Sequence, residues 1–411
     1  MTVDSSTRAA IVVNHPAQYF APAFRAVEAR DDVNATIYYW VSNLEGSYDS
    51  GFGRHVKWDT DLHSGYEWFA PESDGRWWQK ARQTYKMLSH KRPEAVICFG
   101  WRSPVVLVGA AYCAMNHVPF VLYGDTNGRV AMVGVRQQVR RAVLRILFHQ
   151  AAGALTTGVA NSKFYLSHGM APEKLHKGVM PIAVDDFVQA FRRRNVNIIQ
   201  DGVRQFVIGY AGKLVHHKGV DELLQAAALL PPTDAWEVWI VGDGPERSTL
   251  EALAAQLKLK DRCRFLGFKN SKEIPEFLAA MDVLVMPSRF EPRGLVAIEA
   301  MAAGAVPIVS TATGVWGDQD AVEEGVTGFV YPNGNQYVLA EKLRELMHDP
   351  ELVSEISSHA RARACEYGPD AFAASVAGVT RAIRVGGRNV SPHVADGDAG
   401  GSSAGVGRRS R

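Results

Sequence analysis

The sequence predicts an α/β protein built from two doubly wound parallel-sheet domains that face each other across a cleft. The first observation is length, since 411 residues exceed one typical domain and favour two. The second is that short β-branched runs alternate with longer stretches of helical periodicity in both halves, which is typical of βαβ units around a parallel sheet. The third is a polar stretch at 185–204 that interrupts the apolar pattern between the halves.

The first half contains three clear pairs of a strand and a following helix. Strands are predicted over 9–14, 95–99 and 120–124, and they are followed by helical periodicity over 21–29, 104–116 and 133–150. We therefore expect residues 1–184 to form one Rossmann-like domain, with a linker at 185–204.

The second half repeats this alternation. Strands are predicted over 206–211, 236–242, 264–267, 283–286 and 306–310, with helices over 219–230 and 247–257 between them. We expect a second Rossmann-like domain at 205–365. Residues 366–386 are expected to form a C-terminal helix that packs back on the first domain. Residues 387–411 are rich in Gly, Ser and Ala and are expected to be disordered.

Composition excludes several classes of protein. Lys+Arg number 45 and Asp+Glu 43, so a net charge of +2 gives no overall field that would gather nucleic acid. The four cysteines form no C-x-x-C pair, which argues against a disulfide framework and a zinc site and fits a reducing cytosol. Residues 1–10 lack the features of a signal peptide, and the longest apolar stretch, 105–115, falls short of the roughly 20 residues of a membrane span. We expect a cytoplasmic protein, at most peripheral at the inner face of the membrane.

A glycine- and lysine-rich turn follows the first strand of the second half. Residues 212–219 read Gly-Lys-Leu-Val-His-His-Lys-Gly, so Gly212, Lys213 and Lys218 lie between a strand and a helix. Backbone N–H groups at a helix amino end and two ammonium groups suit a diphosphate. The alternative is a plain turn with solvated lysines. The next strand ends in a weaker turn of the same kind, at Gly242 and Gly244.

Two glutamates follow the strand at 283–286. Glu291 lies in the loop after that strand, Gly294 permits a close backbone approach, and 295–303 is predicted as a helix. Glu299 is just over one turn inside this helix, where its carboxylate can accept hydrogen bonds from hydroxyl groups. The alternative is an ordinary amphipathic helix with an exposed glutamate.

With these segments the sequence resembles the retaining glycosyltransferase family four, whose two-domain architecture is called GT-B. The segment 212–219, Gly-Asp-Gly-Pro at 242–245, Leu-Gly-Phe at 266–268 and Glu-x7-Glu at 291–299 occur in the family's order and spacing. The resemblance covers about residues 206–329. It implies an acceptor-binding N-terminal domain and a C-terminal domain that binds a nucleotide sugar.

The resemblance also implies roles for residues. Glu291 would sit beside the donor sugar, Glu299 would bind the ribose hydroxyls, and Lys213 and Lys218 would neutralise the leaving diphosphate. The implied catalytic residues are Glu291, Asp125 and Lys218. The implied donor-binding residues are Gly212, Lys213, Lys218, Gly242, Gly244, Phe268, Glu291, Gly294, Leu295 and Glu299.

Two positions depart from the family pattern, and the first half offers further candidates. Lys213 stands where the family usually has arginine, and Arg293 stands where many members have phenylalanine, so Arg293 is free to reach an anionic group. Asp125 follows a strand at the position of a catalytic Asp or His, with a helix N-cap as the alternative. On the acceptor side, His15, Gly158 and Asn161 are candidates, although a histidine at a strand end is more often structural.

The function that these residues predict is retaining transfer of a sugar from a nucleoside diphosphate sugar, specifically a UDP-sugar, to a hydroxyl acceptor in polysaccharide, glycolipid or glycoside synthesis. No cofactor and no metal is predicted, since Asp59-Thr60-Asp61 lies far upstream of the phosphate-binding elements and the side chains of His216 and His217 diverge. The alternatives are a nucleotide-sugar epimerase of similar fold and a non-catalytic nucleotide-sugar-binding protein.

A basic amphipathic helix is predicted within 133–150. Arg136, Arg140, Arg141 and Arg145 favour peripheral contact with an anionic membrane. The alternative is a surface helix whose apolar stripe packs on the sheet, a stripe formed by Val139, Val143, Ile146 and Leu147.

Overall fold

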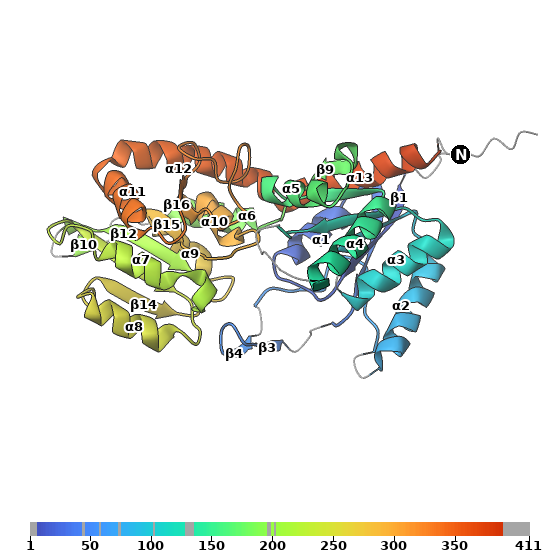
Figure 1. The fold of residues 1–411 in the computed structure, drawn as a ribbon, viewed down its shortest axis with the longest axis horizontal. Coiled ribbons are helices and arrows are strands. Elements are labelled where there is room, and N and C mark those ends of the chain that lie inside the picture. The colour runs from blue at the N-terminus through green and yellow to red at the C-terminus, as the bar shows by residue number, and fades with distance from the viewer. Residues whose placement is uncertain are drawn as a thin grey trace, which may run out of the picture.

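The computed structural model describes residues 6–42, 46–56, 59–72, 75–101, 103–127, 135–194, 199–200 and 203–388. Two parallel sheets with flanking helices form two α/β units, so the predicted fold class is confirmed (Figure 1). Within the described residues, no helix is long and apolar enough to span a bilayer.

The first sheet has seven parallel strands in the order β5-β2-β1-β6-β7-β8-β9. Helices cover both of its faces, which is why adjacent residues of its central strand β1, such as Ile11 and Val12, are both fully buried. The strands are β1 (Thr7–Val13), β2 (Val33–Tyr39), β5 (Trp68–Phe69), β6 (Ala95–Phe99), β7 (Phe120–Gly124), β8 (Gly153–Thr156) and β9 (Leu175–Lys177). The helices are α1 (Phe20–Glu28), α2 (Trp77–Lys91), α3 (Pro104–Asn116), α4 (Val135–Gln150), α5 (Val159–Ser167) and the short 3-10 helix η1 (Pro172–Lys174).

The second sheet has six parallel strands in the order β14-β13-β12-β15-β16-β17. Its strands are β12 (Phe206–Ala211), β13 (Trp236–Val241), β14 (Cys263–Gly267), β15 (Val283–Met286), β16 (Val306–Ser310) and β17 (Phe329–Tyr331). Its helices are α7 (Val220–Ala227), α8 (Arg247–Gln256), α9 (Ile274–Ala279), α10 (Leu295–Ala303), α11 (Gln336–His348) and α12 (Pro350–Ala364), with 3-10 helices η2 (His216–Lys218) and η3 (Cys365–Tyr367). Strand order reverses beside β12, and ligands of such sheets bind outside the carboxyl ends of the strands at this point.

Two small antiparallel pairs lie outside the main sheets. β3 (Ser47–Asp49) pairs with β4 (Arg54–Val56) in a hairpin that Figure 1 shows between the two domains. β10 (Ile199–Gln200) pairs with β11 (Val203–Arg204) just before the second domain begins.

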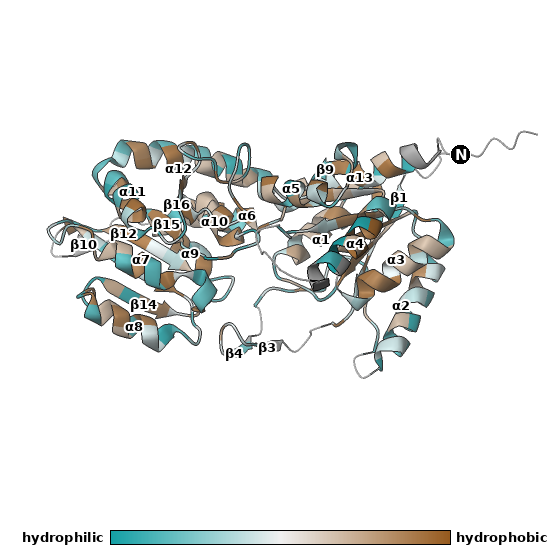
Figure 2. Ribbon diagram, viewed as in Figure 1, coloured by the Kyte–Doolittle hydropathy of each residue, from teal (hydrophilic) through white to brown (hydrophobic). Residues whose placement is uncertain are grey.

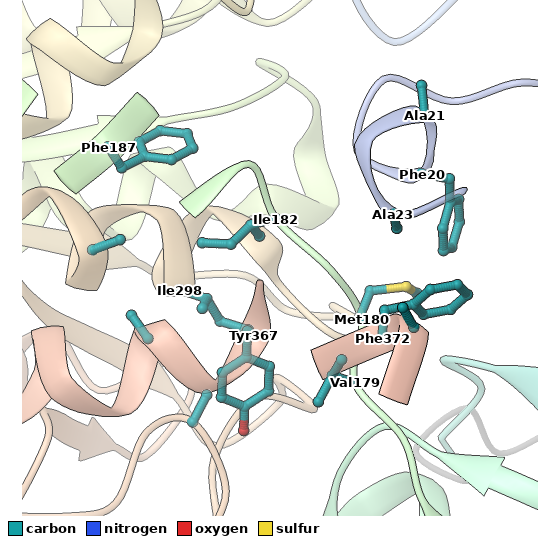
Figure 3. Close-up of a cluster of buried hydrophobic side chains, with 14 of the residues drawn as sticks. Phe20, Ala21, Ala23, Val179, Met180, Ile182, Phe187, Ile298, Tyr367 and Phe372 are labelled. Carbon is teal, nitrogen blue, oxygen red and sulfur yellow. The ribbon is translucent and has the colours of Figure 1, made fainter. Parts of the chain in front are cut away.

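The stretch at 185–204, predicted as a polar linker, begins with a helix that packs on the second domain. This helix, α6 (Val184–Arg193), contacts α9 and α10 and buries Phe187 and Ala190. Figure 3 shows Phe187 in the same cluster of buried hydrophobic side chains as Ile298 of α10. This stretch therefore begins as a packed helix, with two buried apolar side chains among its charged ones.

The chain returns to the first domain through its last helix, α13 (Pro369–Arg388), which packs against α1. Phe372 of α13 lies 6.0 Å from Phe20, between ring centroids, and Figure 3 shows the two together. The two crossing segments also bind each other, because the Ile182 N–H donates to the Tyr367 carbonyl at 2.9 Å. Most of the predicted tail at 387–411, from 389 onward, lies outside the described residues.

The basic helix α4 packs on the core through only part of the predicted stripe, since Leu147 is partly buried against it. Leu144 and Phe148 are buried, whereas Val143 and Ile146 are exposed to 58% and 61%. Figure 2 shows hydrophobic and hydrophilic residues on the visible side of this helix. The side chains of Arg136 and Val139 lie outside the described part of the structure.

Candidate active site

The loops after β12, β13, β14 and β15 meet the first domain at the carboxyl edge of the second sheet. Four of the predicted donor-binding residues, Gly212, Gly242, Phe268 and Glu299, line one cavity there with a volume of about 170 Å³. Gln18 of the first domain lines the same cavity, and its side-chain oxygen is buried with no hydrogen-bond partner among the described groups. The cavity therefore combines backbone turns with polar groups from both domains.

Gly294 is the residue that precedes helix α10 at this edge of the sheet. Its φ of +84° lies in the left-handed region, and an added Cβ would lie 2.6 Å from the Met286 side chain, so only glycine fits. Helix α10 starts at Leu295; the Ala297 N–H donates to the Gly294 carbonyl at 3.1 Å, and the N–H groups of Leu295 and Val296 precede this first hydrogen bond of the helix. A helix amino end with free N–H groups favours an anion.

Lys218 and Glu291 form a partly buried ion pair beside this helix end. Two backbone hydrogen bonds hold the loop that carries Glu291. The Glu291 N–H donates to the Ala312 carbonyl, and the Glu291 carbonyl accepts from the Gly314 N–H at 2.9 Å. The side-chain amide of Asn127, in the first domain, also donates to the Glu291 carbonyl at 3.3 Å and to the Pro292 carbonyl at 3.0 Å. Contacts from both domains thus hold the loop of Glu291, and Glu291 in turn pairs with Lys218.

Asp125 lies on the opposite side of the cleft, in the loop after β7. Burial raises the pKa of its carboxyl group, and the negative charge of Glu291 raises that pKa further. The positive charge of Arg293 acts in the other direction. The structure therefore brings two of the predicted catalytic carboxylates, one from each domain, within electrostatic reach of each other.

Lys213 is engaged by the hairpin of the first domain. Its ammonium group donates to both carboxylate oxygens of Asp49, at 2.8 and 2.9 Å, and lies 5.0 Å from the centre of the Phe52 ring. Phe52 in turn packs edge-on against Phe268, with ring centroids 4.9 Å apart. The hairpin reaches Gly244 as well, because a Cβ there would lie 2.8 Å from the Gly51 carbonyl. The sequence offers no motif that singles out Asp49 or Phe52.

Arg293 does meet an anionic group, and that group is a side chain of the protein. Arg293 is buried and pairs with Asp320 at 2.7 Å, and it also donates to the Gly314 carbonyl at 3.0 Å. Asp320 accepts a hydrogen bond at 2.9 Å from the N–H of Val159, which belongs to the first domain. Gly158 packs directly against this pair, since a Cβ there would lie 2.2 Å from an Arg293 nitrogen. The buried pair therefore joins the Glu291 loop to the first domain.

The remaining first-domain candidates lie apart from the cavity. Asn161 accepts from the Thr157 N–H and donates to the Thr126 carbonyl at 2.7 Å, so it holds the loop that carries Asp125. His15 is exposed, and its ring lies 3.3 Å from the Asn14 amide.

Asp59 and Thr60, from the Asp-x-Asp segment, form hydrogen bonds between the two domains. Thr60 hydrogen-bonds Ser271 at 2.9 Å, and Asp59 accepts hydrogen bonds from Ser271 and from the Lys272 N–H. Among the described residues, no three His, Cys, Asp or Glu side chains are grouped so that they could hold a metal ion.

Glu299 is the charged residue of α10, and burial raises its pKa to about 7. Ribose hydroxyls that donate to this group would favour its ionised form. Uridine affinity is therefore expected to rise with pH, by about tenfold between pH 6 and 8, because the ionised fraction of the free protein rises through that range. Uridine is the suitable probe since it carries no phosphate that titrates there. The measurement is calorimetric titration at several pH values.

Glu299→Gln is the control for this pH dependence. An amide does not titrate, so the variant is expected to bind uridine with an affinity that does not change between pH 6 and 8. An equal pH dependence in the variant and in the wild type would assign the titration to another group.

Comparison with known proteins adds to this geometry. A family model described as "Glycosyl transferases group 1" matches residues 192–363. The 2-deoxystreptamine glucosyltransferase of Streptomyces kanamyceticus is 33% identical over 271 residues, which cover 64% of this chain and 68% of the relative. The alpha-D-kanosaminyltransferase of the same organism is 28% identical, over 66% of this chain and 68% of the relative.

Solved structures agree on the fold. The Anabaena protein HepE, crystallised with UDP and glucose, superposes with a TM-score of 0.66 at 20% identity, over 92% of this chain and 100% of that one. The sucrose-phosphate synthase of Thermosynechococcus elongatus gives a TM-score of 0.66 at 18% identity, over 92% and 100% of the two chains. The two-domain fold of the present chain is therefore GT-B.

Proposed function

The chain belongs to the group 1 glycosyltransferases, and on that premise we propose that it transfers a sugar, with retention, from a UDP-sugar to a hydroxyl acceptor. The observation that carries the proposal is the ion pair of Lys218 and Glu291 beside the amino end of α10, with Asp125 facing it from the other domain. The retaining outcome rests on the resemblance to family four. The choice of UDP rests on that resemblance too, and it agrees with the UDP bound to HepE.

The proposed roles follow from charge and position. The diphosphate lies at the amino end of α10, where Lys218 and the first N–H groups of the helix stabilise the negative charge that develops as the sugar leaves. Glu291 lies beside the sugar and stabilises its developing positive charge. These groups supply the charge stabilisation, so the proposed reaction needs no metal.

The acceptor that we propose is a small polyhydroxylated ring, and not a polymer. One relative supports this class, since it is named for transfer of glucose to 2-deoxystreptamine. Asp125 is the group we assign to the acceptor hydroxyl, because it faces Glu291 from the first domain and burial raises the pKa of its carboxyl group, which makes the carboxylate a stronger base.

The decisive experiment measures release of the nucleoside diphosphate from a panel of UDP-, GDP- and ADP-sugars, with and without a panel of aminocyclitols, for wild type and Glu291→Gln. We expect slow hydrolysis of one UDP-sugar, acceleration by one acceptor, and loss of both in the variant. The anomeric configuration of the product, read by NMR, tests retention. A product of inverted configuration would contradict that part of the proposal.

Other outcomes of the same panel would favour other functions. Conversion of the donor to its epimer without acceptor would identify an isomerase. Donor binding without turnover under every condition would favour a binding protein. If an acceptor accelerates nucleoside diphosphate release only from a GDP- or ADP-sugar, the proposal of sugar transfer stands and the proposal of a UDP-sugar donor is rejected.

We also propose a cytoplasmic location with peripheral membrane contact through α4. Arg141 and Arg145 are exposed there beside the exposed side chains of Val143 and Ile146, a combination that suits an anionic bilayer. Cosedimentation with phosphatidylglycerol vesicles is expected to weaken about tenfold in Arg141→Glu/Arg145→Glu, with little binding to phosphatidylcholine in either protein. Equal sedimentation of variant and wild type would reject this contact.

A further inference from the structure

A second cavity lies at the opposite edge of the C-terminal sheet from the candidate active site. It has a volume of about 660 Å³ and is lined by Phe206, which begins β12, and by Asp282, which precedes β15. The active-site loops follow these same strands, so the two cavities open at opposite ends of the sheet. Residues near the carboxyl ends of α6 and α11 and one face of α12 complete the wall. A molecule bound here would not touch the candidate active site.

Three arginines reach this cavity from three separate segments: Arg194 after α6, Arg204 in β11 and Arg361 in α12. Arg204 forms an ion pair with Asp282. The other carboxylate of the lining belongs to Asp234; its buried Oδ2 lies 3.1 Å from His348 Nε2 and has no hydrogen-bond partner among the described groups. In the part of the chain that the structure describes, Arg194 and Arg361 have no carboxylate partner, so the lining carries an excess of positive charge.

The guanidinium groups of Arg194 and Arg361 both form cation–π contacts with one aromatic ring. The guanidinium carbons of Arg194 and Arg361 lie 4.1 and 4.0 Å from the centre of the Phe191 ring. Burial and the charge of Arg361 lower the pKa of Arg194, the charge of Asp282 acts in the other direction, and the charge of Arg204 lowers the pKa further. The Nε atom of Arg361 is shielded from solvent and has no hydrogen-bond partner among the described groups. Two like charges gathered around one ring, one of them with an unused donor, form a site suited to an anion.

We propose that this cavity binds the phosphate group of a small organic phosphate monoester, with Arg194 and Arg361 as its ligands. Guanidinium groups bind phosphate oxygens through paired, charge-assisted hydrogen bonds. Ser354 lines the same wall on α12, whereas the Ser357 hydroxyl already donates to the Gly304 carbonyl at 2.7 Å. The volume of the cavity falls in the range of small-molecule sites.

The organic part of the ligand is accommodated by the apolar lining. Phe206, Met281, Leu346 and Val353 contribute carbon surface to the wall. The ligand would also bridge α6 and α12, the helix that follows the first crossing between the domains and the helix that precedes the second. Binding is therefore expected to stabilise the folded protein against heat.

The experiment is thermal unfolding with increasing glycerol 3-phosphate, in the presence of saturating UDP so that the candidate active site is filled. Inorganic phosphate is the second probe, and sodium chloride at matched ionic strength is the reference. In the wild type the unfolding midpoint is expected to rise with both phosphates and not with chloride. In Arg194→Met/Arg361→Met, which keeps the carbon stems against Phe191, the apparent affinity is expected to fall at least about tenfold.

Arg192→Met is the matched control, since Arg192 is an exposed residue of the same helix and does not line the cavity. This variant is expected to respond to glycerol 3-phosphate like the wild type. If the double variant does not fold, Arg194→Lys and Arg361→Lys keep the charge and remove the paired geometry, and each is expected to bind more weakly. Unchanged affinity in the arginine variants, or an equal midpoint shift with sodium chloride, would overturn the proposal.

Discussion

Replacement of Lys218 by methionine is expected to lower kcat for sugar transfer about a hundred- to a thousandfold. The substitution removes the cation that pairs with Glu291 beside the amino end of α10. In the proposed reaction the departing diphosphate then loses the positive charge that stabilises it, and this stabilisation is needed more in the transition state than in the bound donor. The loss should therefore appear mainly in kcat, with a smaller change in KM for the donor. The measurement is initial-rate kinetics of nucleoside diphosphate release.

Lys213→Met provides the comparison. The Lys213 ammonium group is bound to Asp49 of the hairpin, and its side chain is 37% exposed against 22% for Lys218, so solvent screens its charge more strongly. We expect this variant to lose no more than about tenfold in kcat. Lys218→Arg should retain part of the activity because it retains the charge. A Lys218→Met enzyme within a few-fold of the wild type, with an unchanged far-UV spectrum, would contradict the role given to this residue.

Replacement of Arg293 by methionine is expected to lower the free energy of unfolding by about 3–5 kcal/mol. The side chains of Arg293 and Asp320 are 3% and 0% exposed, so the variant leaves a buried carboxylate without its cation. It also removes the hydrogen bond to the Gly314 carbonyl next to the Glu291 loop. Activity should fall as well, because that loop loses one of its supports. The change in the free energy of unfolding is measured by urea unfolding, monitored by tryptophan fluorescence and by circular dichroism.

Two further variants isolate the buried charge. In Arg293→Met/Asp320→Leu neither charge remains, so part of the lost stability is expected to return. Arg193→Met breaks an ion pair with Glu276 in which the two side chains are 61% and 52% exposed. This variant should lower the free energy of unfolding by less than about 1 kcal/mol. If Arg293→Met unfolds at the same urea concentration as Arg193→Met, the buried pair does not stabilise the fold as argued.

The sequence predicts best those strands and turns that depend on the pattern of apolar residues and glycines in a short segment. The strands that precede the glycine turns are short, apolar and bounded by glycine, and the parallel arrangement then brings Gly212, Gly242, Phe268 and Glu299 to one edge. Adjacent strand ends explain the contact of Lys218 with Glu291, since β12 and β15 are neighbours in the sheet. Residues far apart in sequence could therefore be assigned to one site without knowledge of their contacts.

What the sequence could not predict are contacts that depend on how the two domains pack. Asp49 reaches Lys213, Asn127 reaches the Glu291 loop and Asp320 reaches Val159, each across the domain interface. None of these residues belongs to a local pattern that a periodicity or a turn would reveal. In α6 the charged side chains near its carboxyl end, Arg192 and Arg193, favour a helix terminus but made the segment resemble a linker.

The return of α13 to the first domain has a consequence for synthesis on the ribosome. Arg381 of α13 forms an ion pair with Asp32, a residue 349 positions earlier in the chain, and Phe372 covers Phe20 and Phe24 of α1. The apolar face of α1 therefore stays uncovered until α13 has been translated, since Arg381 follows Asp32 by 349 positions. An uncovered apolar face favours aggregation of the nascent first domain during that interval, whereas the second domain can complete its own sheet as soon as β17 emerges.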